Sequence, residues 1–211
     1  GHFLKTDGTE NGTVSLAKVA LSNVGDGYAN EMNNTSLKTP THLYFEGSSK
    51  DASDVRQTDL WKSDGTAAGT VKFKSFAVGS VNSNTNGLHN YDIQNMVFAN
   101  GLVFFTMTDA TNSKVDLWKT DGTEAGTVRL YEGCIAELGS YNNYVYYFIK
   151  GTADMYGNAP YTLRRHNGTT GGFVKNLAST SSNITNIPRF FGVVNNKLLF
   201  TADGTIVLNS N

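Results

Sequence analysis

Three aspartates at a fixed spacing are the residues of this chain whose type and position could do chemistry. Asp7, Asp64 and Asp121 each begin an Asp-Gly-Thr triplet, and both intervals (64 − 7 and 121 − 64) are 57 residues. A carboxylate in such a triplet can act as a general acid or base, ligate a metal ion, or accept hydrogen bonds from its own turn. A side chain that recurs in every repeat more often serves the repeat than a single site. We therefore expect the three aspartates to hold turns.

The triplets belong to a longer repeated phrase at residues 3–14, 60–71 and 117–128. A degraded copy follows at 163–174, with Asn167 in place of the aspartate and a shorter step (167 − 121) of 46 residues. An Asp-Gly pair between two strands is typical of a hairpin, because glycine tolerates positive φ and the aspartate can accept backbone hydrogen bonds. A period of this length is that of one supersecondary unit.

Other positions of the phrase have expected structural roles of their own. The threonines that follow the Asp-Gly pair can cap the same turn, and Gly69 and Gly126 admit a bulge or a close backbone approach. Trp61 and Trp118 are the large apolar side chains best suited to fill the space between neighbouring sheets. The phrase is thus interpreted as scaffold.

The elements that must position these residues are short strands. Apolar blocks and alternation at strand length, separated by Asn-Gly and Asp-Gly turns, predict four strands per unit and no sustained helix. The expected strands are at 3–5, 13–19, 33–38, 42–46, 59–62, 93–99, 101–108, 115–120, 127–131, 136–141, 144–149, 161–165, 172–177, 188–194 and 197–202.

This strand pattern predicts an all-β, β-propeller-like fold made of blade-type four-stranded antiparallel sheets. The single repeat domain 1–211 divides into units at about 20–74, 75–131 and 132–177, with partial units at 1–19 and 178–211. The first partial unit holds a third and a fourth strand, and the last holds a first and a second. They could complete one another in a four-bladed ring with a shared closing blade. Alternatively, the chain is a fragment of a larger propeller.

Composition limits the function classes. The chain has 211 residues, 17 basic and 18 acidic side chains, so no field of one sign indicates a nucleic-acid partner. The longest apolar runs are of strand length, which argues against membrane insertion. Cys134 is the single cysteine, which excludes an internal disulfide, and we expect it to be a small buried apolar group. No signal peptide is visible and the chain opens within a repeat, which suggests a fragment or a processed form.

The phrase also resembles the ELWxxDGT repeat family of large secreted and surface-attached bacterial proteins. The pattern of Leu-Trp, two residues, Asp-Gly-Thr, two residues and Gly-Thr is intact at 60–70 and 117–127. The family's leading glutamate is replaced by Asp59 and Asp116, and the copies at 3–14 and 163–174 depart further. The resemblance implies a propeller-like architecture, an extracellular or cell-surface location and membership of a larger surface protein or complex. It implies no catalytic residue. The hairpin also resembles the Asp-box of sialidase-like propellers, in structure only.

If the phrase is scaffold, function lies where the repeats differ. The connections between second and third strands vary most and would share one face with the links between units. Aromatic faces, amide tips and a few charges in these connectors suit recognition of an extracellular glycan or protein. The ligand-binding candidates are Arg56, His89, Tyr91, Asp109, Asn112, Asp154, Tyr156 and Asn158, with Asp51 and Asp54 beside them.

Three function classes follow from this arrangement. The first is a noncatalytic binding or adhesion module that reads glycan or protein through the variable connectors. The second is a structural repeat spacer that carries other domains. The third is a glycan-processing enzyme, which needs two carboxylates about 5 to 10 Å apart; Asp54, Asp109, Asp154 and Asp203 are the loop carboxylates available. No catalytic residue is assigned, no cofactor is expected, and bound Ca²⁺ remains a minor alternative at 51–54 or 109–112.

Overall fold

The computed structural model describes residues 1–19, 36–54, 56–77, 93–109, 114–152, 155, 159–177 and 188–202. These residues form an all-β structure, and no helix occurs among them. No segment in these ranges is a helix long and apolar enough to cross a membrane.

Within the described ranges, sixteen strands form three four-stranded antiparallel sheets and two hairpins. The first hairpin pairs β1 (His2–Lys5) with β2 (Val14–Lys18), and the last pairs β15 (Arg189–Val194) with β16 (Lys197–Thr201). Within each sheet the strands follow chain order. The sheets consist of β3 (Ser36–Lys38), β4 (Leu43–Lys50), β5 (Arg56–Ser63) and β6 (Val71–Ala77); of β7 (Ile93–Ala99), β8 (Leu102–Asp109), β9 (Lys114–Thr120) and β10 (Val128–Tyr131); and of β11 (Ile135–Tyr141), β12 (Tyr144–Lys150), β13 (Tyr161–His166) and β14 (Gly171–Leu177).

The expected strands are confirmed, most closely in the β7–β10 and β11–β14 sheets, where the bounds differ by a residue or so. In the first full sheet β4 and β5 are longer than expected, and β3 is shorter within the described residues. Each two-residue turn between a first and second strand in the later units uses residues with positive φ. Examples are Asn100 at 51° with Gly101 at 75°, and Asn142 at 50° with Asn143 at 63°. Such turns match the twist of the strands they join.

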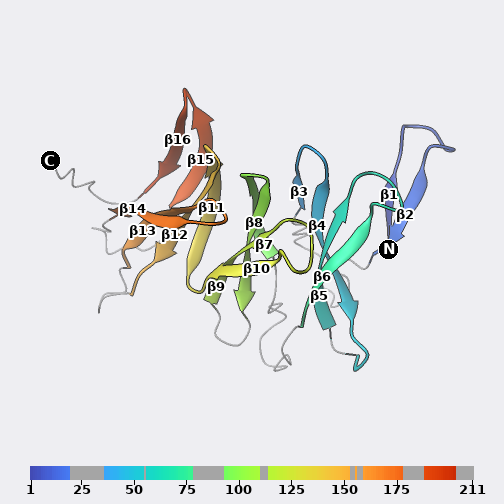
Figure 1. Cartoon of the computed structure of the whole chain (residues 1–211), viewed down its shortest axis with the longest axis horizontal. Helices are drawn as coiled ribbons and strands as arrows, with labels where there is room; N and C mark the ends of the chain where they lie inside the picture. Colours follow the sequence, from blue (N-terminus) through green and yellow to red (C-terminus); the bar gives the residue numbers. More distant parts are fainter. Residues whose placement is uncertain are drawn as a thin grey trace.

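The sheets stand in a row, with the β1/β2 hairpin at one end and the β15/β16 hairpin at the other (Figure 1). The two hairpins form separate two-stranded sheets, so the four-bladed ring with a shared closing blade does not form within the described part of the chain. The physical reason is geometric: each sheet packs on the next, and the row does not bend far enough to bring its ends together. An open array of blade-like sheets is the arrangement present.

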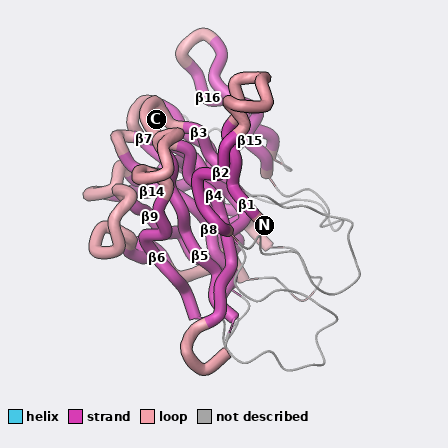
Figure 2. The backbone as a smooth tube through the Cα atoms, turned by 90° about the vertical axis from the view of Figure 1, so that its right-hand side faces the viewer, coloured by secondary structure: helices cyan, strands magenta, loops and turns pink. Residues whose placement is uncertain are grey.

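Among the described residues, three apolar clusters lie between successive sheets. One joins the β3–β6 sheet to the β7–β10 sheet through Leu60, Phe76 and Phe105. A second lies between the β7–β10 and β11–β14 sheets, and a third between the β11–β14 sheet and the last hairpin. Viewed from the end of the row, the strands of different sheets project onto one another (Figure 2). The core is therefore a series of layers between sheets.

The β7–β10 sheet is covered on both faces, and the sequence of β8 reflects this burial. Phe104 and Phe105 are neighbours on β8 and are both 0% exposed, one facing each adjoining sheet. A strand buried on both faces carries a continuous apolar run, whereas a strand with one wet face alternates. This explains why residues 102–105 are uniformly apolar.

The expectation for Cys134 is wrong. Its side chain is exposed, immediately before β11, and its carbonyl accepts a hydrogen bond of 3.0 Å from the amide of Lys150. The residue lies in the short link between two sheets, outside the layers that bury apolar side chains. The thiol is therefore not part of the core.

Candidate functional site

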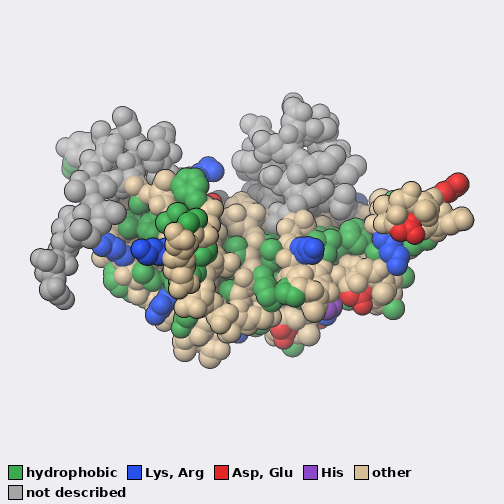
Figure 3. Space-filling model, turned by 90° about the horizontal axis from the view of Figure 1, so that it is seen from above, with side chains coloured by type: hydrophobic (Ala, Val, Ile, Leu, Met, Phe, Trp, Pro, Cys, Tyr) green, Lys and Arg blue, Asp and Glu red, His purple; other side chains and the backbone are tan. Residues whose placement is uncertain are grey.

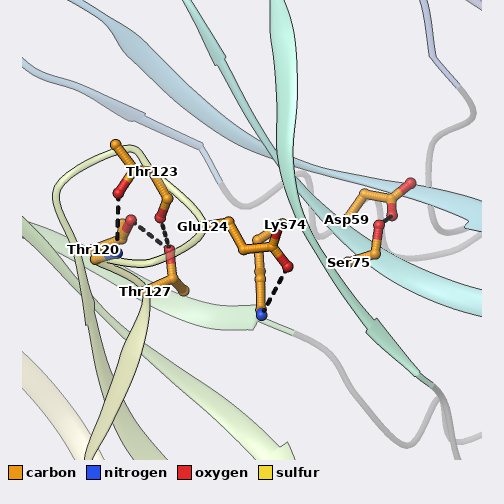
Figure 4. Close-up of polar contacts among 8 residues, drawn as sticks. Asp59, Lys74, Ser75, Thr120, Thr123, Glu124 and Thr127 are labelled. Atoms are coloured by element: carbon orange, nitrogen blue, oxygen red, sulfur yellow. Dashed lines mark hydrogen bonds and ion pairs between the residues drawn. The ribbon is translucent and has the colours of Figure 1, made fainter.

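The repeated Asp-Gly-Thr phrase forms a turn whose polar groups satisfy one another. In the turn between β9 and β10, Asp121 Oδ1 accepts from the amide of Thr123 at 2.9 Å and from its hydroxyl at 2.7 Å. Thr123 Oγ1 accepts from the amide of Gly126 at 2.9 Å. The Thr127 hydroxyl donates to the carbonyl of Thr123 at 2.6 Å and lies 2.8 Å from the Thr120 hydroxyl (Figure 4). One carboxylate oxygen and three hydroxyls thus close the hairpin.

The same network recurs in the two earlier copies. Asp64 Oδ1 accepts from the Thr66 amide at 2.8 Å and hydroxyl at 2.7 Å, and Asp7 makes the equivalent pair with Thr9 at 3.0 and 2.7 Å. The glycine after each aspartate has positive φ, at 93° for Gly8 and 87° for Gly65. In all three copies the aspartate, the first glycine and the threonine thus lie within one hydrogen-bonded turn.

The second glycine of the phrase has a different role from the one expected. A Cβ placed on Gly12, Gly69 or Gly126 would collide with the carboxylate of the aspartate five positions earlier. The register shift lies elsewhere, between Leu60 and Trp61 where β5 pairs with β6. The close approach at this glycine is therefore that of the aspartate side chain, and glycine is required because the carboxylate fills the space.

The degraded copy keeps the turn with different groups. Asn167 Oδ1 accepts from the amides of Thr169 and Thr170 at 3.0 and 2.8 Å, and Gly168 keeps a positive φ of 98°. His166 Nδ1 accepts from the Gly168 amide at 2.8 Å, which is the role of Thr120 in the preceding copy. An amide oxygen without charge is thus sufficient for this hairpin.

These hydrogen bonds lower the pKa of each aspartate below its ordinary value. For Asp7 and Asp64 the main cause is the hydroxyl of the threonine two residues later, followed by its amide. For Asp121 the Thr123 hydroxyl is again the largest cause, and partial burial opposes it. Donors to the ionised form favour that form. A general acid needs a raised pKa near neutral pH, so these carboxylates are poorly suited to proton donation.

The tryptophans pack between layers. Trp118 stacks on Phe105 with ring centroids 6.2 Å apart and meets Phe76 of the preceding sheet edge-on at 5.2 Å. Trp61 stacks on Phe45 at 6.1 Å. Neither buried indole N–H has a hydrogen-bond partner among the described residues. Trp118 thus lies between the β3–β6 and β7–β10 sheets.

A lysine that follows the tryptophan position links each unit to the next, which the sequence analysis missed. Lys5 Nζ donates to the carbonyl of Gly65 at 3.1 Å, and Lys119 Nζ donates to the carbonyl of Gly168. The Lys62 side chain lies beside Gly122 and lowers the pKa of Asp121. The constant lysine in all three full copies was the available signal. The carbonyl that the lysine contacts could not be predicted, because the partner turn lies one unit away.

Two buried carboxylates were also missed. Asp59 is 0% exposed and accepts from Ser75 Oγ at 2.6 Å (Figure 4). It also accepts from Ser49 Oγ at 3.1 Å. Asp116, at the equivalent position, is 2% exposed and accepts from Arg129 at 3.1 Å and from the amide of Gly133 at 3.1 Å. Both lie two residues before a tryptophan, where the resembled family has glutamate. Each anchors the fourth strand or the link that follows it.

Most of the predicted ligand-binding residues lie outside the described residues: His89, Tyr91, Asn112, Asp154, Tyr156 and Asn158. Arg56 and Asp109 are placed by their backbones alone. Arg56 is the first residue of β5 and pairs with Lys50, and Asp109 is the last of β8 and pairs with Lys114. Both therefore lie at the end of the strands from which the variable connectors leave.

The turn at 51–54 is held by its own contacts. Asp51 Oδ1 accepts from the amide of Ser53 at 2.8 Å, and Asp54, at φ 62°, pairs with Lys50 at 2.8 Å. Among the residues that the structure describes, no group of three or more His, Cys, Asp or Glu side chains is placed to hold a metal ion.

Comparison of the chain with protein-family models, with curated proteins and with solved structures finds no match. The resemblance to ELWxxDGT repeats therefore rests on the residues of the phrase alone.

Proposed function

We propose that this chain is a noncatalytic binding module of an extracellular or cell-surface protein that recognises glycan or protein through the connectors at one edge of its sheets. The observation that carries the proposal is that the recurring polar residues and the variable polar residues lie in different parts of the fold. Those that recur in the units are engaged inside turns, inside layers or between units, whereas those that vary lie in the connectors.

The strand register indicates that the connectors leave the sheets at a common end of the strands. Lys50 pairs with Arg56, Asp109 with Lys114, and Lys150 with Tyr161, so each link between second and third strands leaves the same end of its sheet. The fourth strands of two sheets finish at this end too, because Gln57 pairs with Ala77 and Tyr161 pairs with Leu177. The Asp-Gly-Thr turns close the opposite end. Binding residues usually lie on variable loops that a rigid framework positions.

The proposal includes a propeller-like arrangement of the units. The first strands of successive sheets lie in contact: β3 with β7, β7 with β11, and β11 with β15. Radial convergence of first strands is the arrangement of propeller blades around an axis. On this proposal the row is part of such a ring, and the location outside the cell follows from the resemblance to secreted repeat proteins.

A glycan array and a panel of extracellular polysaccharides, probed with the labelled chain, test the function. Binding is expected, and Arg56→Ala with Asp109→Ala is expected to reduce it. Glu10→Ala is the matched control, because Glu10 is exposed on the β1/β2 turn at the opposite edge. Binding that is lost in the control and kept in the connector variant would overturn the proposal. No binding to any glycan or surface protein would favour a structural spacer.

A further inference from the structure

Arg164 is a polar residue that differs from the other repeats and lies inside a sheet, in exception to the connectors. It stands in β13 at the tryptophan position of the repeated phrase. In the two earlier sheets this tryptophan pairs with a cation of the fourth strand, Lys72 or Arg129. In the β11–β14 sheet the two residue types are exchanged, because Arg164 pairs with Phe173.

The exchange leaves the Arg164 guanidinium without a carboxylate. The fourth-strand cations of the earlier sheets each lie close to a buried aspartate, at 3.5 Å for Lys72 and 3.1 Å for Arg129. The position of that aspartate is Thr162 in β13, and the Thr162 hydroxyl donates to the side chain of Asn176 at 3.2 Å. Arg164 makes no ion pair or hydrogen bond with another of the described residues.

The same guanidinium is partly enclosed. The Arg164 side chain is half-buried, and its Nε is buried with no hydrogen-bond partner among the described residues. The guanidinium carbon lies 5.8 Å from the centre of the Tyr131 ring, which belongs to β10 of the preceding sheet. Removal of a charged group from water costs free energy unless an opposite charge or a hydrogen bond compensates, and the face of a ring compensates only in part. A bound anion would supply the missing acceptor.

Aromatic rings adjoin this guanidinium from both sheets. Phe173 pairs with Arg164, so both side chains lie on the same face of the β11–β14 sheet, and Phe173 is 59% exposed. The Tyr131 ring lies over Gly133, where an added Cβ would be 2.7 Å from the ring. Gly133 stands at the position of Phe76, the ring that meets the tryptophan in the preceding layer. The two sheets that border this layer each have four strands, so the exposed ring belongs to the interior of the row.

The distribution of charge along the chain favours an anion in this region. Residues 135–211 contain six Lys or Arg and three Asp or Glu, whereas residues 1–134 contain eleven and fifteen. On the face drawn in Figure 3, Lys and Arg side chains gather at the β11–β16 end of the row, and Asp and Glu side chains lie mainly toward the β1/β2 end. A positive local field attracts an anionic ligand even where the whole chain is nearly neutral.

From these observations we propose that Arg164, with the rings of Tyr131 and Phe173 beside it, binds an anionic sugar residue, one that carries a carboxylate or a sulfate. The guanidinium donates to the anionic group in a fixed planar geometry. The exposed face of Phe173 contacts the apolar face of the sugar ring.

The size of the site favours a sugar over a macromolecular surface. One cation and two rings suit a single sugar residue. They form neither the larger apolar core of a protein interface nor the positive groove that follows a nucleic-acid backbone. Because Arg164 lies within β13 and not at the connectors, this inference does not rest on the connector site proposed above.

Calorimetric titration with small oligosaccharides tests the site. The probes are an oligogalacturonate, a sulfated oligogalactoside and the uncharged oligogalactoside. We expect at least one charged probe to bind, the uncharged probe not to bind, and the binding to weaken with added salt. The charged probe that binds identifies the anionic group. The proposal is overturned if neither charged probe binds, if the uncharged probe binds equally well, or if polyglutamate or single-stranded DNA binds in preference to the sugars.

Substitutions on the two faces of β13 locate the binding. Arg164→Gln should weaken the affinity for the charged probe about tenfold or more, because a charge-assisted pair is lost. Arg165→Gln is the matched control, since it removes the same charge from the neighbouring residue, which lies over the Tyr144 ring at 4.6 Å. Phe173→Leu keeps an apolar side chain but removes the ring, and should also weaken the binding. Equal losses in Arg164→Gln and Arg165→Gln, or unchanged affinity in Phe173→Leu, would contradict the proposed contacts.

A further variant separates binding from folding. Arg164→Trp restores the residue type of the earlier sheets, so the protein should fold and lose its affinity for the charged probe. In the absence of sugar, its free energy of unfolding in urea should equal or exceed that of the wild type, because a half-buried cation without a partner is removed. A marked loss of stability in Arg164→Trp would show that the arginine holds the layer together, and this result, like retained binding, would overturn the proposal.

Discussion

Replacing Gly126 with alanine is expected to destabilise the protein through the aspartate five positions earlier. An added Cβ would collide with the Asp121 carboxylate, so the carboxylate must leave its place. Two hydrogen bonds are then lost, from the Thr123 amide at 2.9 Å and from its hydroxyl at 2.7 Å. The backbone itself is not the obstacle, because Gly126 does not have the positive φ that Gly122 has.

The magnitude follows from those two bonds. A hydrogen bond contributes about 0.5–1.5 kcal/mol net, and solvent screening keeps this exposed carboxylate near the lower end of the range. Gly126→Ala should therefore lower the free energy of unfolding by about 1–2 kcal/mol. In an Asp121→Ala background the collision is absent. There, alanine at 126 should be neutral or stabilise by about 0.5 kcal/mol, because it restricts the unfolded chain more than glycine does.

A double-mutant cycle measures this coupling. The wild type, Gly126→Ala, Asp121→Ala and the double variant are unfolded in urea, with tryptophan fluorescence as the common probe. The structure predicts a coupling free energy of about 1–2 kcal/mol between the two positions. If Gly126→Ala costs as much in the Asp121→Ala background as in the wild type, then the carboxylate is not the reason for the glycine.

Three further outcomes are expected. Because the pKa of Asp121 is lowered in the folded state, the stability that its ionised form contributes is complete above the unfolded pKa and is lost as the pH falls through the folded pKa. The free energy of unfolding, measured between neutral pH and about pH 3, should fall in the wild type and fall less in Asp121→Asn. Equal dependence of the free energy of unfolding on pH in the two proteins would contradict this. Lys119→Met keeps the aliphatic stem but removes the donor to the next unit, so urea unfolding should show a loss of about 1 kcal/mol that the exposed Lys18→Met control lacks. Phe105→Ala should cost about 3–5 kcal/mol in the same assay, because Phe105 is 0% exposed, and Phe173→Ala, at 59% exposed, should cost about 0.5 kcal/mol or less; similar losses for both would contradict the layered core.

The strands could be predicted closely because their signals are local. The run 93–99 and the run 102–109 are apolar blocks bounded by Asn-Gly and by polar residues, and turn residues with positive φ separate them. The Asp-Gly-Thr turn could be predicted for the same reason, since all of its donors and acceptors lie within a few residues of Asp121. Repetition made the prediction stronger, because each copy tested the others.

What depends on the next unit could not be predicted. The Lys119 link ends on a carbonyl 49 residues away, and no pattern near Lys119 indicates Gly168. Closure of a ring depends on small angles between successive sheets, which no single repeat specifies. The exposure of Cys134 depends on how little packs over the link between two sheets. The burial of Asp59 was hidden because a carboxylate at a strand position is usually solvated.

The neighbours of the candidate ligand-binding residues could not be predicted for a related reason. The candidate residues were chosen where the units differ, and a position that differs carries no periodic signal about its neighbours in space. Arg56 and Asp109 are placed at the connector edge by strand pairing. The remaining candidates need their own measurement, beginning with the connector variants above.

The central claim is that the recurring aspartates are structural acceptors inside their own turns. Carboxyl-detected NMR titration of Asp7, Asp64 and Asp121 tests it most directly. The account predicts that all three have a pKa below the ordinary aspartate value and that added Ca²⁺ leaves the three titrations unchanged. A pKa at or above the ordinary aspartate value, or a titration that shifts with Ca²⁺, would contradict the claim. These carboxylates would then be candidates for a catalytic or metal-binding role.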